Sequence, residues 1–87
     1  MVFYVYLIKS LDNLKKKTYV GYTNDVDKRL LQHNKNLGAK STKGYKWELV
    51  YKRKFNSKSK ALSFEYKLKK DRKTRLKLIY DFKKSKN

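Results

Sequence analysis

Residues 19–34 read Tyr-Val-Gly-Tyr-Thr-Asn-Asp-Val-Asp-Lys-Arg-Leu-Leu-Gln-His-Asn, and this stretch ends a strand, turns and begins a helix. Its aromatic and β-branched beginning favours a strand. Gly21 permits the close backbone approach or the positive φ that a strand exit often needs. The charged and leucine-containing remainder predicts a helix over residues 25–36.

The predicted helix has a start signal and two distinct faces. Thr23 or Asn24 can serve as the N-cap, and with Asn24 in that role Asp27 occupies the third helical position, where a carboxylate complements the helix dipole. Arg29 and His33 are four residues apart and therefore project from one face. The apolar stripe expected to dock on the sheet consists of Val26, Leu30 and Leu37.

The composition predicts one small domain that folds without disulfides. The chain has 87 residues and no cysteine, and no apolar run approaches the roughly 20 residues of a membrane span. The absence of cysteine excludes a zinc–cysteine site and fits a reducing cytoplasm. The apolar start is typical of a strand and not of a signal peptide, because no basic region precedes it and no small-residue cleavage site follows it. We therefore expect a single cytoplasmic domain over residues 1–87, ending in a frayed tail at 83–87.

The charge of the chain is its strongest compositional feature. Lys and Arg number 25 against 7 Asp and Glu, which gives a formal net charge of +18. This excess indicates a polyanion partner, nucleic acid before others, since Lys and Arg neutralise phosphates and aromatic rings offer surfaces for base stacking. AT-rich coding also enriches lysine, but it does not by itself remove acids. A membrane-surface role is disfavoured because no long helix separates a basic face from a large apolar one.

The periodicity of the chain predicts an α/β fold, a small three-stranded, largely antiparallel sheet flanked by three helices. The predicted strands cover residues 2–8, 18–22 and 47–55, and the predicted helices cover residues 25–36, 58–69 and 72–84. A polar connection at 9–17 makes the first two strands a plausible hairpin. Asn56 or Ser57 caps the second helix, and Asp71 caps the last one.

The side chains of each element are assigned to faces by the same periodicity. Both faces of the first strand should be buried, one carrying Val2, Tyr4, Tyr6 and Ile8 and the other Phe3, Val5 and Leu7. In the third strand we expect one face to carry Trp47, Leu49, Tyr51 and Phe55. The last helix should point inward Leu76, Ile79 and Tyr80.

A basic loop follows the first helix. Residues 35–46 contain two glycines and four lysines, which is typical of an exposed, mobile loop suited to phosphate contacts. The residues expected to contact nucleic acid, here and on neighbouring elements, are Lys40, Lys43, Lys46, Tyr22, Lys69 and Lys70.

The side chains able to carry chemistry are few. One histidine, two glutamates and no cysteine exclude a Cys-His nucleophile and a multi-histidine metal site. Nucleophile-elbow and phosphate-loop glycine patterns are also absent. Glu65 is the anomaly, because it lies on the apolar face of its helix, where a carboxylate is costly unless it is paired or binds a metal. A salt bridge to a lysine would satisfy it, as would a single hydrated Mg²⁺.

Five motifs occur in order along the chain: Tyr4-Val5-Tyr6, Tyr19-Val20-Gly21, Arg29 with His33-Asn34, Trp47-Glu48-Leu49-Val50, and Glu65. In order and spacing they resemble the GIY-YIG nuclease family over about residues 3–80. The likeness is greatest to compact stand-alone members and to the nuclease domain of endonucleases that cut branched DNA. Tyr4, Val5 and Val20 depart from the family motifs but keep strand character. Tyr22 stands where some members have a lysine.

The resemblance implies a role for each motif residue. Tyr6 and Tyr19 would be the paired active-site tyrosines, one of which deprotonates the attacking water. Arg29 would hold the phosphate, and His33 would assist proton transfer or hydrogen-bond a tyrosine. Glu65 would be the metal ligand.

The implied activity is a Mg²⁺-dependent endonuclease, with Mn²⁺ as a substitute, that hydrolyses single-stranded or branched DNA in repair. The sequence does not indicate an oligomeric state, and a monomer is assumed. Two other functions are consistent with the sequence. One is a non-catalytic nucleic-acid-binding module that keeps the fold for its basic surface. The other is a structural partner of a larger nuclease or ribosomal assembly.

Overall fold

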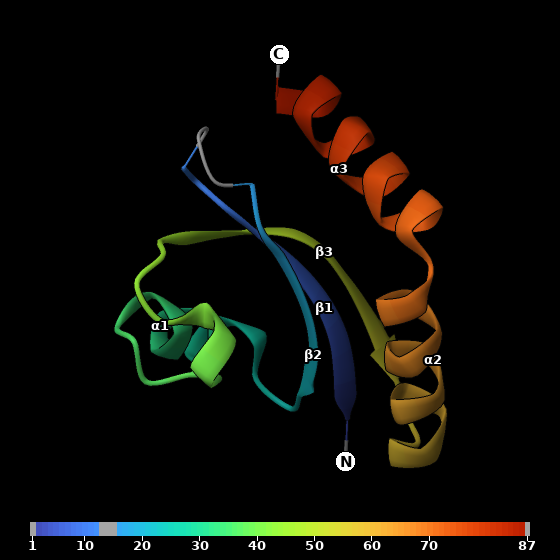
Figure 1. The fold of residues 1–87 in the computed structure, drawn as a ribbon. Helices are drawn as coiled ribbons and strands as arrows, with labels where there is room; N and C mark the ends of the chain where they lie inside the picture. Colours follow the sequence, from blue (N-terminus) through green and yellow to red (C-terminus); the bar gives the residue numbers. More distant parts are fainter. Residues whose placement is uncertain (1, 13–15, 87) are drawn as a thin grey trace.

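The computed structural model describes residues 2–12 and 16–86. Its elements are β1 (Phe3–Ser10), β2 (Thr18–Thr23), α1 (Val26–Asn34), the short 3-10 helix η1 (Lys40–Thr42), β3 (Trp47–Phe55), α2 (Lys58–Lys70) and α3 (Arg72–Lys86) (Figure 1). The strands form one antiparallel sheet in the order β2-β1-β3. The predicted fold class and hairpin are confirmed. Residues 13–15 of the predicted polar connection lie outside the described residues, as does Asn87 of the predicted tail.

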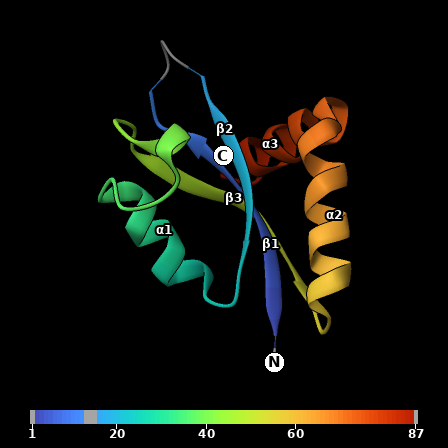
Figure 2. The same ribbon diagram turned by 60° about the horizontal axis from the view of Figure 1, so that its bottom comes forward.

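The sheet separates two layers of helix. Helix α1 covers one face, and α2 and α3 lie on the other (Figures 1 and 2). Because β1 is the central strand, its side chains alternate between the two faces of the sheet and are buried on both, as predicted. The α2 side of the sheet buries Val5, Leu7, Val20, Ala61 and Leu68. The α1 side buries Tyr6, Ile8, Val26 and Trp47.

The third strand departs from the predicted alternation. In the β1–β3 register Leu7 pairs with Tyr51 and Ile8 pairs with Leu49, so Val50 is an extra residue on β3. A bulge of this kind interrupts the period of two, and the side chains beyond it change face. Trp47 and Leu49 therefore pack on the α1 side, whereas Tyr51 and Phe55 pack on the α2 side. The prediction that these four share one face was wrong.

Helix α1 begins one residue later than predicted and ends two residues earlier. The N-cap is Asp25 and not Thr23 or Asn24, because the extended Asp25 accepts a hydrogen bond from the backbone N–H of Lys28 at 3.1 Å. Asp27 consequently lies at the second helical position, still within the first turn. Leu37, predicted to belong to the docking stripe, follows the helix end and is 70% exposed.

The last two helices begin where the capping residues predict. The Ser57 hydroxyl accepts from the Lys60 N–H and the Asp71 carboxylate from the Thr74 N–H. The buried face of α3 differs from the prediction. Leu78 and Ile79 pack on the core, whereas Leu76 and Tyr80, which were predicted to point inward, are 53% and 64% exposed. The helix is also longer, since the segment predicted as a frayed tail stays helical to Lys86.

None of the helices in the described part of the chain is long and apolar enough to span a membrane.

Candidate active site

A chain of hydrogen bonds lies between the sheet and α1. The Tyr6 hydroxyl lies 2.8 Å from His33 Nε2, and His33 Nδ1 lies 2.9 Å from the Thr42 hydroxyl. Thr42 in turn donates to the carbonyl of Ala39 at 2.7 Å. Tyr6 is 2% exposed, and both His33 and Thr42 are fully buried. The network therefore links β1, α1 and η1 within the protein interior.

The end of this chain fixes the tautomer of His33. A carbonyl only accepts, so the single hydroxyl proton of Thr42 goes to Ala39. Thr42 must then accept from His33 Nδ1, which leaves Nε2 with a lone pair. Burial, and then the positive charge of Arg29, lower the pKa of His33 and keep the ring neutral. The Tyr6 hydroxyl therefore donates its proton to His33 Nε2.

Three other motif residues act on the same hydroxyl. Burial raises the pKa of Tyr6 to about 12, the neighbouring Arg29 guanidinium opposes this rise, and the charges of Tyr19 and Glu65 add to it. The Tyr19 ring centroid lies 6.3 Å from that of Tyr6 and 5.0 Å from that of His33. The structure thus brings together all five residues that the sequence predicted as catalytic.

Two glycines make this close arrangement possible. A Cβ on Gly21 would lie 2.5 Å from the Tyr6 hydroxyl oxygen and 3.0 Å from the Tyr19 ring. A Cβ on Gly38 would overlap His33 Nδ1. The sequence distinguishes Gly21 as a strand-exit glycine, whereas it presents Gly38 and Thr42 only as parts of a loop. Their sequence signal is a glycine and a hydroxyl residue shortly after the single histidine.

The loop between α1 and β3, predicted to be exposed and mobile, is joined to its flanking elements by hydrogen bonds. Asn36 Oδ1 accepts from the Gly44 N–H at 2.9 Å, and the Trp47 indole donates to the Thr42 carbonyl at 3.0 Å. Lys46 donates to the Asn34 carbonyl at 3.0 Å. These contacts hold Thr42 against His33, so the loop is part of the site's framework.

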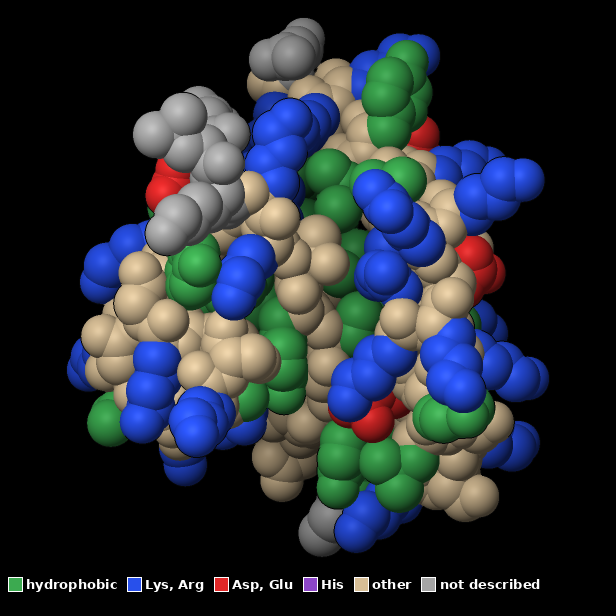
Figure 3. Space-filling view, in the orientation of Figure 1, with side chains coloured by type: hydrophobic (Ala, Val, Ile, Leu, Met, Phe, Trp, Pro, Cys, Tyr) green, Lys and Arg blue, Asp and Glu red, His purple; other side chains and the backbone are tan. Residues whose placement is uncertain are grey.

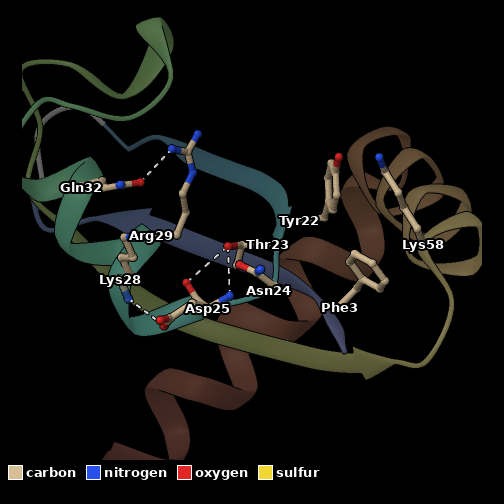
Figure 4. A pocket seen from close by; sticks show the side chains of 9 residues that line it. All are labelled: Phe3, Tyr22, Thr23, Asn24, Asp25, Lys28, Arg29, Gln32 and Lys58. Carbon is tan, nitrogen blue, oxygen red and sulfur yellow. Dashed lines mark hydrogen bonds between the residues drawn. The ribbon is translucent and has the colours of Figure 1, made fainter. Parts of the chain in front are cut away.

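Arg29 opens onto a surface hollow of about 470 Å³ at the end of β2 (Figure 4). Its guanidinium donates to Gln32 at 3.0 Å, which orients it. Tyr22 and Lys58 line the opposite side of the hollow, on β2 and α2. Arginine is suited to phosphate here because its planar donors remain charged at all relevant pH values. The hollow thus presents the cations of Arg29 and Lys58 together with the carboxylate of Asp25.

A second hollow, of about 210 Å³, lies beside Tyr19, Lys69 and Arg75. Of the lysines predicted to bind nucleic acid, Lys69 lines this hollow. Lys70 lies over the Tyr66 ring. Lys40 and Lys43 are exposed on the anchored loop near His33, outside the two hollows.

Glu65 is the carboxylate nearest to this chemistry. Its side chain is 15% exposed, and its Oε2 lies 3.7 Å from Lys69 Nζ, a loose ion pair. Within residues 2–12 and 16–86, no three His, Cys, Asp or Glu side chains form a metal-binding group. A single carboxylate nevertheless fits Mg²⁺ or Mn²⁺, since Mg²⁺ commonly keeps several waters and takes its other oxygens from substrate phosphate. The donor set is therefore adequate for a hydrated ion shared with the substrate.

The buried neutral His33 should make stability depend on pH. Its pKa in the folded chain is below the usual 6.5. As the pH falls, the histidine of the unfolded chain therefore binds a proton before that of the folded chain does. The stability that the neutral imidazole contributes is fully present above about pH 6.5 and is lost as the pH falls through the folded pKa. We expect the free energy of unfolding to decrease between about pH 7.5 and 5, by at most about 1.4 kcal/mol per pH unit. A lower Tm over the same range would report this decrease.

The His33→Gln variant is the control for this measurement. The chain contains one histidine, so the variant should be less stable at pH 7.5 but should lose most of the pH dependence in this window. A parental protein whose Tm does not change down to pH 5 would contradict a buried, neutral imidazole.

Known proteins resemble this chain along most of its length. The family model described as the GIY-YIG catalytic domain matches residues 2–78. A UPF0213 protein of Staphylococcus saprophyticus is 42% identical over 78 residues, which are 87% of this chain and 92% of that protein. Another from Staphylococcus haemolyticus is 44% identical with the same coverage. The solution NMR structure of a UPF0213 protein from Bacillus halodurans is 36% identical, covers 92% of this chain and 84% of its own, and has a TM-score of 0.54.

Proposed function

The chain belongs to the GIY-YIG family, and from that premise we propose that it is a metal-dependent endonuclease that hydrolyses phosphodiester bonds in DNA, preferably single-stranded or branched. The observation that carries the proposal is the Tyr6–His33 hydrogen bond, whose proton is directed toward a neutral imidazole. A surface used only for binding has no evident need for such a buried proton acceptor. Action on branched DNA would assign the protein to cytoplasmic DNA repair.

Tyr6 and His33 would act together as the base. With a pKa near 12, the phenol is protonated at neutral pH and cannot by itself accept a proton from water. Its hydroxyl oxygen can accept the proton of an attacking water while its own proton moves to His33 Nε2. Thr42 supports this transfer, because it holds the Nδ1 proton of the resulting imidazolium. Tyr19, which packs against both rings, shields the pair from bulk water.

The remaining residues would act on the phosphate. Arg29, oriented by Gln32, neutralises the charge that develops on the phosphate oxygens. Glu65 would hold a Mg²⁺ or Mn²⁺ ion. When bound, that ion supplies positive charge beside the scissile phosphate and the leaving oxygen.

The surface charge supports a DNA substrate. Lys and Arg side chains flank both sides of a central band over β2, with the α1 side and the α2–α3 side each contributing (Figure 3). The two hollows at Arg29 and Tyr19 lie along this edge strand. A nucleic-acid strand following β2 would therefore pass Tyr22 and Tyr19.

Cleavage by the Tyr6→Phe variant tests the proposal. Removing the hydroxyl eliminates the proton acceptor but keeps the ring, so the rate should fall by about 10²–10⁴-fold. The assay uses single-stranded, duplex and flap DNA and a matched RNA, each with Mg²⁺, Mn²⁺ or EDTA. Parental protein should cut only with the metal, and the affinity for DNA should be unchanged in the variant.

The alternative function is a non-catalytic binding module, which the net charge of +18 favours. Parental protein that binds every substrate but cuts none, with either metal, would support that module and overturn the nuclease proposal. A Tyr6→Phe variant that cuts at the parental rate would retain the nuclease and overturn the role of Tyr6.

A further inference from the structure

A third hollow, of about 380 Å³, lies between α3 and the β1–β2 hairpin. Most of the charged side chains that line it are cationic. Asp12 is the only carboxylate among the described residues of the lining. The six cations are Lys9, Lys16, Lys17, Arg72, Arg75 and Lys83. None of them belongs to the set predicted to bind nucleic acid.

This hollow is continuous with the candidate active site. It shares Thr18 and Arg75 with the hollow beside Tyr19 and Lys69. The three hollows therefore follow β2 from Tyr22 to Thr18 and then reach α3. Four residues of strand span about 13 Å, which is about four nucleotide steps along a B-form strand.

Half of the six cations already have structural roles. Lys9 forms an ion pair with Glu48 at 2.9 Å, and Lys17 lies 4.7 Å from the centroid of the Tyr45 ring. Arg75 donates to the carbonyl of Leu68, at the end of α2.

The other three are available to a ligand. Among the described residues the ion pairs are formed by Lys9, Lys69 and Lys86, so Lys16, Arg72 and Lys83 have no carboxylate partner there. All three are exposed. With six cations and one carboxylate, Asp12, around it, the hollow carries an excess of positive charge, and a polyanion would relieve the repulsion among these cations.

We propose that this hollow binds the phosphates of the nucleic-acid strand where it leaves the active-site edge, so that the substrate is held on one side of the scissile bond. The inference rests on the proposed function for the identity of the polyanion. It adds a binding site on α3 that extends the contact beyond the catalytic residues. Leu76 and Ile79, which line the same hollow, offer apolar surface for sugars or bases.

A nucleic acid fits this hollow better than a lipid surface does. A membrane requires a broad apolar face next to the charges, and outside its core contact the described part of α3 exposes only Leu76 and Tyr80 as large apolar side chains. The hollow instead adjoins the one beside Tyr19, and the hollow lined by Arg29 lies farther along β2. A linear polyanion is the ligand whose shape follows that path.

The test compares two double variants that remove the same charge. Arg72→Gln with Lys83→Gln changes the proposed site, whereas Lys54→Gln with Lys60→Gln changes exposed lysines that line none of the three hollows. Binding of parental and variant proteins to a single strand of about 16 nucleotides is measured in EDTA over a range of salt concentrations. Thermal melts establish that both variants are folded.

The expected result is a change in salt dependence for the first pair alone. Losing two phosphate contacts on a single strand should make the slope of log K against log salt shallower by about 1.4. The fall in affinity between about 50 and 200 mM salt then becomes about sevenfold smaller. The Lys54/Lys60 pair should keep the parental slope.

Two results would overturn the inference. One is an equal slope for the two double variants. The other is a loss of binding to vesicles of equal phosphatidylcholine and phosphatidylglycerol in the Arg72/Lys83 pair while its DNA binding stays parental, which would identify a lipid site. Because the assay needs no cleavage, an inactive protein with the expected slope difference would refute the proposed nuclease but not this binding site.

Discussion

Replacing Glu65 by glutamine should abolish DNA cleavage and leave the protein folded and bound to DNA. Glutamine keeps the volume and reach of the side chain but removes the charge that would hold a divalent cation. We expect the cleavage rate to fall by about 10³-fold or more, because charge stabilisation at the phosphate is lost. The affinity for DNA, measured in EDTA, should be unchanged or higher, since a negative charge has left the phosphate path.

A structural role for Glu65 predicts a different result. Its 3.7 Å pair with Lys69 is an i,i+4 pair on a helix, which is worth only about 0.3–0.5 kcal/mol. If the carboxylate only neutralised that lysine, the variant would be slightly less stable and equally active per folded molecule. Folded Glu65→Gln protein that cuts at the parental rate would refute the metal-binding role.

The Glu48→Gln variant is the matched control. Glu48 is the other glutamate of the chain, is similarly shielded, and forms ion pairs with Lys9 and Lys86, both at 2.9 Å. The Lys9 pair joins β1 to β3, and the Lys86 pair joins the end of α3 to β3. The control should therefore lower the Tm and leave cleavage per folded molecule unchanged, so the comparison separates loss of any glutamate from loss of the site.

The predictable features of this fold are those with local causes. Each strand is identified by β-branched and aromatic residues, and Ser57 and Asp71 cap their helices where short polar side chains precede an apolar pattern. The convergence of Tyr6, Arg29 and Glu65 was predictable only through the family resemblance. The chemistry of each side chain, considered alone, is equally consistent with a structural role.

The features that sequence could not supply are set by tertiary contacts. The extra residue Val50 shifts the register of β3 through its pairing with β1, which no pattern within β3 reveals. The Asp25 cap was missed because Asn24 has equal intrinsic preference, and the choice depends on where the backbone becomes extended. Thr42 reaches His33 only because η1 folds back onto α1. A loop contact of this kind has no periodicity to detect.

Substituting Gly21 by alanine should disable the site by steric displacement. The added methyl would lie 2.5 Å from the Tyr6 hydroxyl oxygen and 2.7 Å from Tyr6 Cζ, so Tyr6 must move from His33. A displacement of about 1 Å in a catalytic group costs about 10²-fold in rate. Overpacking should lower stability by about 1–3 kcal/mol, partly offset because alanine favours a strand over glycine by about 0.5–1 kcal/mol.

Gly44→Ala separates this displacement from a general loss of stability. Gly44 has φ +86, and no atom lies within 4 Å of the methyl that alanine would add, so the substitution costs about 1–2 kcal/mol of backbone strain. Alanine keeps the backbone N–H that donates to Asn36, so the contact that anchors the loop is retained. The two variants should therefore melt at similar, reduced temperatures, while cleavage per folded molecule falls only in Gly21→Ala. Equal activity of the two would mean that Tyr6 need not keep its hydrogen bond to His33, and the proton transfer from Tyr6 to His33 would have to be abandoned.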